Sequence, residues 1–346
     1  MNRPELRISS NAFRTNIAAV RARIAPSALM LVLKDDAYGH GLGWAVETAV
    51  EAGVSWFGSY DVRGGVRVRR IVGGDARILA WATSTDDEID EALAHDLDLG
   101  VGTADYLRRV IARAEILGRR ARVHLKIDTG LHRNGILPDE WAAAIAEVRE
   151  AEVRGHLTLA GVWSHIAEAS DADDDASRLV FLDAVRVAGE AGVSPDVLHL
   201  TASAASWWRP ELRGSVSRIG AFCYGIRSAD GPELDGIRPV ASLCAVVSEV
   251  VGGDAVVGVG SFDGLPSTLR DASVGTPAGA RRLRAIGETT SIVEGWSGMR
   301  PGDEVTIFGD GRSGEVSATT LAERIDTVGE EILTRLSPRV RRVIVD

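Results

Sequence analysis

The stretch ALMLVLKDDAYGHG, residues 28–41, joins an apolar run to a polar segment that contains glycine. The run Leu29–Leu33 is short and apolar throughout, which is typical of a strand buried on both faces of a parallel sheet. Lys34 follows directly. We therefore predict a buried strand whose carboxyl end presents an amine.

Seven similar runs follow in the first two-thirds of the chain: Val54–Ser59, Ala76–Trp81, Leu97–Val101, Val123–Ile127, Leu157–Trp163, Val197–Leu200 and Ser217–Gly220. Longer stretches with helical spacing lie between them, such as Ala104–Gly118. Eight β/α repeats predict an α/β fold of the (β/α)8 TIM-barrel type. A doubly wound open sheet is the alternative, but no G-x-G-x-x-G motif follows the first strand.

The composition changes after residue 225. A segment rich in Gly, Pro and Asp is followed by β-branched runs at Leu243–Val251, Ala255–Val259 and Glu304–Phe308, which predict a mostly β C-terminal domain. Thr319–Leu336 has a helix-like pattern. We place the barrel at residues 1–228, with the first residues able to join the β domain, and the β domain at residues 229–346.

Charge and composition narrow the function classes. A formal net charge of −10 argues against a nucleic-acid-binding surface. No apolar run is long enough to span a membrane, and the first residues lack the pattern of a signal peptide. Two cysteines fit a reducing compartment, so we expect a cytoplasmic protein. We expect no metal site.

Only two of the 39 basic residues are lysines, Lys34 and Lys126. Arginine can replace lysine at most solvated positions, but it cannot form an imine or a carbamate. Codon bias explains the scarcity of lysine, and it makes the two that remain candidates for amine chemistry. Lys34, Lys126, His165, His199 and Arg218 all fall on or next to predicted strands, near the face where TIM barrels carry their active sites.

LKDDAYGHG, residues 33–41, resembles the K-A-D-A-Y-G-H-G signature of alanine racemases. The resemblance implies a barrel followed by a β domain, a homodimer, a small amino-acid substrate and pyridoxal 5′-phosphate (PLP) as cofactor. It implies that Lys34 is the Schiff-base lysine and the base for the D-amino acid, and that Tyr38 contacts the phosphate. The alternatives are a lysine that reaches from the strand end to solvent and a packed loop aromatic. Asp35 replaces the usual alanine, and strand alternation predicts that it points away from Lys34.

KIDTGLHRNG, residues 126–135, resembles the K-x-D-T-G-M-x-R-x-G stretch of the same family. The resemblance implies that Lys126 is carbamylated and paired with Arg133, which orients the cofactor's phenolic oxygen and the substrate. A buried interaction between Lys126 and Asp128 is the alternative.

SHIAEAS and HLTASAA, residues 164–170 and 199–205, resemble two further family stretches. The resemblance implies that His165 packs against the pyridine ring and that Ser203 binds the phosphate near a helix N-terminus. A hydrogen-bonded core histidine and a serine N-cap are the alternatives. Ala202 replaces the usual asparagine.

SRIGAFCYG, residues 217–225, resembles R-x-G-I-x-x-Y-G. The resemblance implies that Arg218 donates to the pyridine nitrogen, and that Gly220 and the Ala221 amide approach the phosphate. A surface salt bridge is the alternative for Arg218.

The β domain departs from the family. Racemisation needs a second base on the other face of the α-carbon, which the family supplies as a tyrosine of the partner's β domain. Val259 stands at the matching position, and residues 226–346 contain no tyrosine, histidine or lysine. Asp254, Asp263 and Glu288 are the remaining candidates, since burial can raise the pKa of a carboxylate.

Three hypotheses follow. The first is a PLP-dependent isomerase that converts L-alanine to D-alanine, with Lys34 and an unidentified second base. The second is a one-base PLP lyase or decarboxylase on the same fold. The third is a PLP-binding protein without turnover.

Overall fold

The computed structural model describes residues 3–346. The chain forms two compact units that interleave along the sequence. The barrel unit contains Val20–Lys34 and Ala49–Gly220, and the β unit contains the residues up to Ala19, Asp35–Thr48 and Ala221–Asp346.

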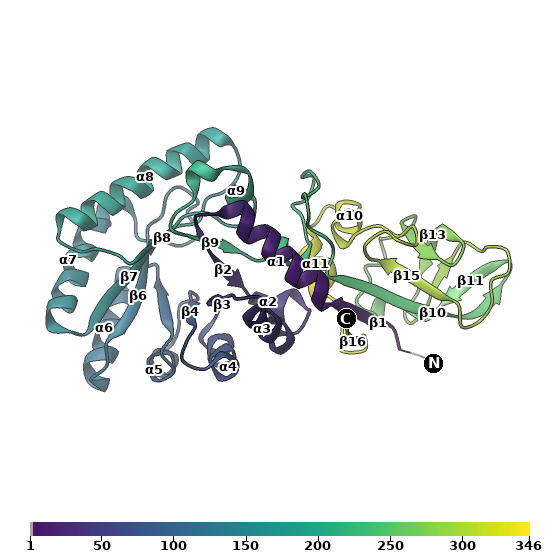
Figure 1. Cartoon of the computed structure of the whole chain (residues 1–346), viewed down its shortest axis with the longest axis horizontal. Coiled ribbons are helices and arrows are strands. Elements are labelled where there is room, and N and C mark those ends of the chain that lie inside the picture. Colours follow the sequence, from purple (N-terminus) through teal and green to yellow (C-terminus); the bar gives the residue numbers. More distant parts are fainter. Residues whose placement is uncertain (1–2) are drawn as a thin grey trace. The chain divides into compact units, whose positions relative to one another are not determined.

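Eight parallel strands form the core of the barrel unit (Figure 1). They are β2 (Ala28–Val32), β3 (Trp56–Tyr60), β4 (Arg77–Ala80), β5 (Asp98–Val101), β6 (Ala121–Lys126), β7 (Leu157–Trp163), β8 (Val197–His199) and β9 (Val216–Ile219). The strand order β8-β7-β6-β5-β4-β3-β2-β9 brings the first barrel strand beside the last. The predicted barrel is confirmed, and each strand coincides with one of the eight apolar runs.

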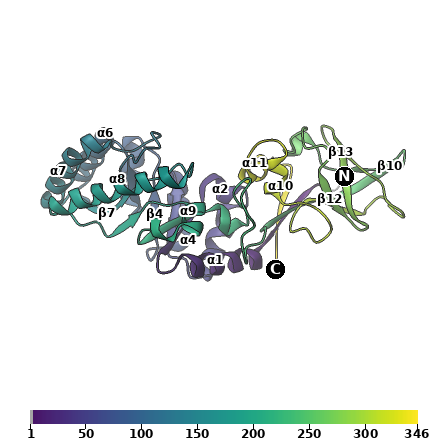
Figure 2. The same cartoon turned by 90° about the horizontal axis from the view of Figure 1, so that it is seen from above.

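Helices follow the strands. They are α4 (Val62–Val72), α5 (Asp86–Ala94), α6 (Ala104–Leu117), α7 (Pro138–Arg154), α8 (Asp171–Glu190) and the short α9 (Ser203–Trp208), followed by η1 (Pro210–Leu212). Figure 2 shows α6, α7 and α8 side by side outside the strands. Local sequence sets their ends: Thr85 and Glu88 form a capping box at α5, and Gly118 ends α6 in the left-handed conformation.

The β unit contains a six-stranded antiparallel ring. Its strands are β10 (Ala241–Val251), β11 (Asp254–Val257), β12 (Ser273–Thr276), β13 (Gly279–Ile286), β14 (Ser291–Val293) and β15 (Glu304–Phe308). The pairings run β10-β11-β14-β13-β12-β15 and return to β10, so the ring has no free edge. β1 (Glu5–Ser9) and β16 (Arg341–Val345) extend the sheet beyond β10. The predicted mostly β domain is confirmed.

The helix-like pattern at Thr319–Leu336 forms two short helices, α10 (Ala318–Glu323) and α11 (Gly329–Thr334). The prediction of one stretch was wrong because Asp326 takes a left-handed conformation, with φ 56°, which ends helical propagation. The remaining elements are α1 (Ser10–Ile24), α2 (Lys34–Tyr38), α3 (Leu42–Glu51), η2 (Ala221–Tyr224) and η3 (Ser261–Asp263).

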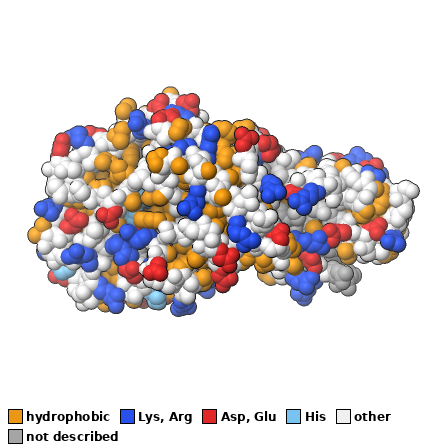
Figure 3. Space-filling view, in the orientation of Figure 1, with side chains coloured by type: hydrophobic (Ala, Val, Ile, Leu, Met, Phe, Trp, Pro, Cys, Tyr) orange, Lys and Arg blue, Asp and Glu red, His pale blue; other side chains and the backbone are white. Residues whose placement is uncertain are grey.

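Acidic and basic side chains are interspersed over the face seen in Figure 3. Within residues 3–346, no helix combines the length and apolar character needed to cross a membrane.

Candidate active site

Four cationic side chains of the barrel unit act together on His165, which follows β7. Burial and the charges of Arg218, Arg133, Lys126 and Lys34 lower the pKa of His165 to about 3. These residues come from β9, the loop after β6, the end of β6 and the position after β2. The barrel therefore gathers the five side chains at the carboxyl end of its strands, and His165 is neutral at physiological pH.

Arg218 is buried, with 4% of its surface exposed, so it is not a surface residue. Its Nη1 donates to the carbonyl of His199 at 2.8 Å, and its Nη2 donates to the carbonyls of Ser164 and Leu200 at 2.7 and 3.1 Å. It makes no ion pair with a described carboxylate, which excludes the salt-bridge alternative among residues 3–346. Burial and the charge of Arg133 lower its pKa to about 9, so the guanidinium stays charged at neutral pH.

The Nε–H of Arg218 takes part in none of these hydrogen bonds. Nη1 and Nη2 carry four of the five N–H groups of a guanidinium. They face five acceptors, three carbonyls and two histidine rings, so one N–H of Nη2 is shared between two of its three acceptors. No described residue accepts from Nε. The site therefore keeps one fixed donor for a ligand.

Lys126 is also buried, with 4% exposure, and its ammonium lies 4.8 Å from the centre of the Trp163 ring. Burial and the charges of Arg133 and Arg218 lower its pKa to about 8. No direct Lys126–Asp128 ion pair forms among the described residues, but the charge of Asp128 still raises the pKa of Lys126, so the alternative of a buried interaction stays open. The Asp128 carboxylate instead accepts from the backbone of Gly130 and from His132.

Lys34 begins an unusual turn. Asp35, Asp36, Ala37 and Tyr38 all have φ between 54° and 56°, in the left-handed helical region. Such a conformation costs about 1–2 kcal/mol for each residue other than glycine. The expectation that strand alternation would orient Asp35 is wrong, because β2 ends at Val32.

Tyr38 and Ala221 both belong to the β unit. The backbone of Ala221 forms a hydrogen bond with the Tyr38 hydroxyl, although burial holds the pKa of the phenol well above its usual value. The Tyr38 ring packs at 4.9 Å from that of Tyr224. The hydroxyl and amide expected at a phosphate therefore lie in contact.

Ser203 and Gly220 are joined by a hydrogen bond in the barrel unit. The Gly220 amide donates to Oγ of Ser203 at 3.3 Å. The alternative that Ser203 is an N-cap is wrong, because Ala202 occupies that position and Ser203 is the first residue of α9.

The β unit offers no equivalent group at Val259. This side chain is fully buried, and its carbonyl accepts from Ser291. Asp254 pairs with Arg284 at 3.0 Å and Asp263 with Arg339 at 2.9 Å, whereas Glu288 is exposed.

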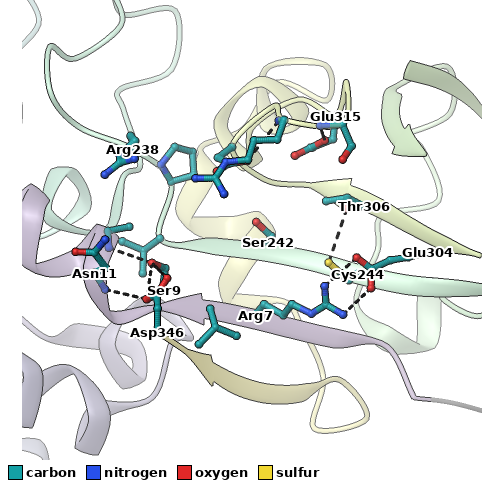
Figure 4. Close-up of a pocket in the computed structure, with 17 residues that line it drawn as sticks. Arg7, Ser9, Asn11, Arg238, Ser242, Cys244, Glu304, Thr306, Glu315 and Asp346 are labelled. Carbon is teal, nitrogen blue, oxygen red and sulfur yellow. Dashed lines mark hydrogen bonds and ion pairs between the residues drawn. The ribbon is translucent and has the colours of Figure 1, made fainter. Parts of the chain in front are cut away.

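A pocket of about 370 Å³ opens elsewhere in the β unit (Figure 4). It lies beside Arg7, whose Nη1 donates to Glu304 at 2.8 Å, and Ser9, which donates to Asp346 at 3.0 Å. Its carboxylates and guanidiniums pair largely with each other, and it contains none of the predicted site residues.

Asp98 and His124 are completely buried in the barrel unit and are not among the residues predicted from the sequence. His124 lies two residues before Lys126 on β6, so the two side chains share the inner face of the barrel. That spacing was the signal that could have identified His124.

The fold and the site together define a barrel protein whose strand ends carry an amine, a neutral imidazole and buried cations. Residues 8–228 match the alanine racemase N-terminal domain and residues 253–344 match the alanine racemase C-terminal domain. The alanine racemase of Thermobifida fusca is 35% identical, over 98% of this chain and 97% of its own length.

Solved structures agree. The crystal structure of alanine racemase from D-cycloserine-producing Streptomyces lavendulae has a TM-score of 0.91 at 32% identity, covering 100% of this chain and 98% of its own. That of Streptomyces coelicolor has a TM-score of 0.93 at 30% identity, covering 99% and 98%. The chain belongs to the alanine racemase family of isomerases.

Proposed function

We propose that the protein is a PLP-dependent amino-acid racemase, with alanine as the default substrate, in which Lys34 binds the cofactor covalently. The observation that supports this most is the convergence of four cations on the neutral His165. A phosphate, a phenolate and a carboxylate are the anions that such a site would bind.

The residues present fit PLP. Arg218 would donate its remaining N–H to the pyridine nitrogen, and His165 would pack against the ring. Ser203, Gly220, Tyr38 and Ala221 would hold the phosphate. When bound, PLP supplies an electron sink for the α-carbon of an amino acid. Because a guanidinium does not easily give up its proton, Arg218 would leave the ring nitrogen unprotonated and limit that sink.

We propose that Lys126 is carbamylated and pairs with Arg133. Its lowered pKa, about 8, increases the fraction of neutral amine that can react with CO2. A carbamate would place a negative charge near the guanidiniums of Arg133 and Arg218, which now have no carboxylate partner among the described residues. Growth with ¹³C-bicarbonate should give a carbamate signal that Lys126→Ala removes and Lys34→Ala keeps. Absence of the signal in the unmodified protein would refute the assignment.

The two faces of the substrate differ. Lys34 would take the α-proton on the D-amino-acid face. The other face lacks the family's tyrosine, because Val259 is buried and has no exchangeable proton. Loss of a general acid or base typically slows a reaction about 10²–10⁴-fold. This observation favours a second candidate, a one-base PLP lyase or decarboxylase, and leaves a PLP-binding protein without turnover as the third.

We propose further that the protein works as a cytoplasmic homodimer. In this proposal residues 1–228 bind the cofactor and residues 229–346 form the β domain that faces a partner's substrate.

Borohydride reduction tests the cofactor. The protein should retain a PLP chromophore that borohydride reduces onto the peptide containing Lys34. Lys34→Ala should abolish this adduct, whereas Lys126→Ala should keep it. An adduct that persists without Lys34, or none in the unmodified protein, would overturn the cofactor assignment.

Incubation with L- and D-alanine in deuterated water tests the reaction. Exchange of the α-proton and interconversion from both enantiomers would support racemisation. Exchange of the D form alone would favour one-sided chemistry. No exchange with any amino acid, despite a Lys34 adduct, would leave binding without turnover.

A further inference from the structure

A continuous hydrogen-bonded array crosses the interior of the barrel unit. His124 Nε2 lies 3.1 Å from Oδ2 of Asp98, and His124 Nδ1 lies 2.7 Å from Nε2 of His199. His199 Nδ1 lies 3.0 Å from Nη1 of Arg218. The side chains of Asp98, His124 and His199 are completely buried.

We propose that Asp98, His124 and His199 form a positioning array that fixes the guanidinium of Arg218. Asp98 and His124 are then positioning residues for a site that neither of them touches. The fixing of Arg218 stands on the contacts of the barrel unit, and only its benefit to a bound cofactor rests on the proposed function.

Hydrogen-bond chemistry gives the array one direction. A guanidinium only donates, so His199 Nδ1 accepts from Arg218 and carries no proton. The proton of a neutral His199 is then on Nε2, where it faces His124 Nδ1. His124 accepts there and donates its own Nε2–H to Asp98. An imidazolium at either position would set two N–H groups against each other.

Asp98 provides a fixed acceptor at the other end. Its Oδ1 accepts from Arg122 Nε at 2.6 Å, and its Oδ2 accepts from Arg77 at 2.7 Å as well as from His124. Burial alone would raise the pKa of Asp98, but its hydrogen bond with His124 and the surrounding positive charges, those of Arg122 and Arg77 among them, hold it at about 2. The carboxylate therefore stays ionised and cannot become a donor to His124.

Packing holds both rings. Trp163 stacks on His199 with its ring centre 5.5 Å away and an interplanar angle of 14°, and its indole N–H donates to the carbonyl of His124. Gly161 leaves space for His124, because a Cβ at position 161 would lie 2.4 Å from Nδ1. Trp163 and Gly161, both on β7, therefore pack directly against the two rings.

Two matched variants separate positioning from general packing. Glutamine offers amide N–H donors and one carbonyl acceptor, so His124→Gln can keep the direction of the array. His124→Leu fills part of the space but can form no hydrogen bond with either His199 or Asp98. His95→Gln is the control, because the only hydrogen bond of the His95 ring among the described residues is with the carbonyl of Glu91 in the preceding helix.

Nuclear magnetic resonance of the cofactor-free full chain, labelled with ¹⁵N in histidine and arginine, gives the decisive readout. In the unmodified protein at pH 7, His124 and His199 should both carry their proton on Nε2. Solvent exchange of the Arg218 Nε–H should accelerate at least about tenfold in His124→Leu, equivalent to about 1.4 kcal/mol. It should remain within about twofold in His124→Gln and His95→Gln.

Several results would overturn the proposal. A proton on Nδ1 of either ring in the unmodified protein would contradict the proposed direction of hydrogen-bond donation. An imidazolium at pH 7 would contradict the array itself, because two N–H groups would then face each other. Equal exchange of the Arg218 Nε–H in the leucine and glutamine variants would show that His124 acts only by filling space and not through its hydrogen bonds. If His124→Leu does not fold, accelerated exchange in His124→Gln decides against the proposal. All of these readouts use the cofactor-free protein, so a missing Lys34 adduct would refute the proposed function and leave the array supported.

Discussion

The cations at the candidate site of the barrel unit differ from the candidate carboxylates of the β unit in how they are paired. In the barrel, Lys126, Arg133 and Arg218 make no ion pair with any carboxylate of residues 3–346. In the β unit, the carboxylates of Asp254 and Asp263 are each paired with an arginine. Unpaired cations in a partly buried site are costly unless a ligand neutralises them.

The difference indicates which unit carries charges that remain for a ligand and which unit uses its charges to stabilise its own structure. The barrel unit retains charge that a ligand can neutralise, whereas the carboxylates of the β unit are already used in its own structure. A chain of this family can thus keep cations at its candidate binding site although its residues 226–346 contain no tyrosine, histidine or lysine.

The largest expected effect is loss of stability in mild acid. Burial lowers the pKa of His40 to about 4 and, together with nearby cations, that of His165 to about 3, and it places that of His199 well below its usual value. As pH falls below about 6.5, the unfolded chain binds protons that the folded chain does not. Stability should therefore fall by about 1.4 kcal/mol per pH unit for each such proton.

Because two of these histidines are in the barrel, hydrogen exchange at pH 4.5 should show β6–β8 losing protection before β10–β15. The reverse order would contradict the comparison.

Arg218→Leu should cost about 3 kcal/mol or more. Three buried carbonyls would lose their donor, and each unsatisfied group costs about 1–3 kcal/mol. Urea unfolding measures the change, with Arg133→Leu as the control. Arg133 is exposed and donates to no described group, so its replacement should leave the midpoint nearly unchanged. Equal losses in the two variants would mean that the cations are not held differently.

Val259→Tyr tests whether the β unit can regain a base by a single change. Because Val259 is fully buried, the ring would overpack the β unit at a cost of about 3 kcal/mol. We expect a lower melting temperature and no gain in α-proton exchange of L-alanine. A gain in exchange would show that this position reaches a substrate and would remove the contrast between the units.

Gly161→Ala should have the smallest effect, about 1–2 kcal/mol, because its Cβ would press on the ring of His124. Gly74→Ala is the matched control, since nothing lies within 4 Å of a Cβ there. Thermal denaturation should separate the two variants. Equal melting temperatures would show that the space beside His124 is not needed.

The barrel was predictable because its signal repeats. Eight apolar runs of similar length give the same result eight times, so errors at single strand ends do not change the fold. The helix-like pattern at Thr319–Leu336 had no such redundancy, and a left-handed residue at Asp326 was enough to divide it.

The site was predictable where a motif carried it and obscure where packing made it. Lys34, Lys126 and Arg218 lie in recognisable stretches. Asp98 and His124 do not, because pairing between strands distant in the sequence creates their contact. Likewise, the left-handed conformation of Ala37 and Tyr38 opposes their local preference, so only the folded chain reveals it.

The scarcity of lysine has a practical consequence for chemical labelling. Arginines make up 37 of the 39 basic residues, so the chain carries only two side-chain amines. Both stand at the mouth of one barrel, and Lys126 is almost inaccessible. The extent of acylation by an amine-directed reagent thus reports on the accessibility of that mouth. Mass spectrometry would read it from the two lysine-containing peptides, with almost no side-chain background from the rest of the surface.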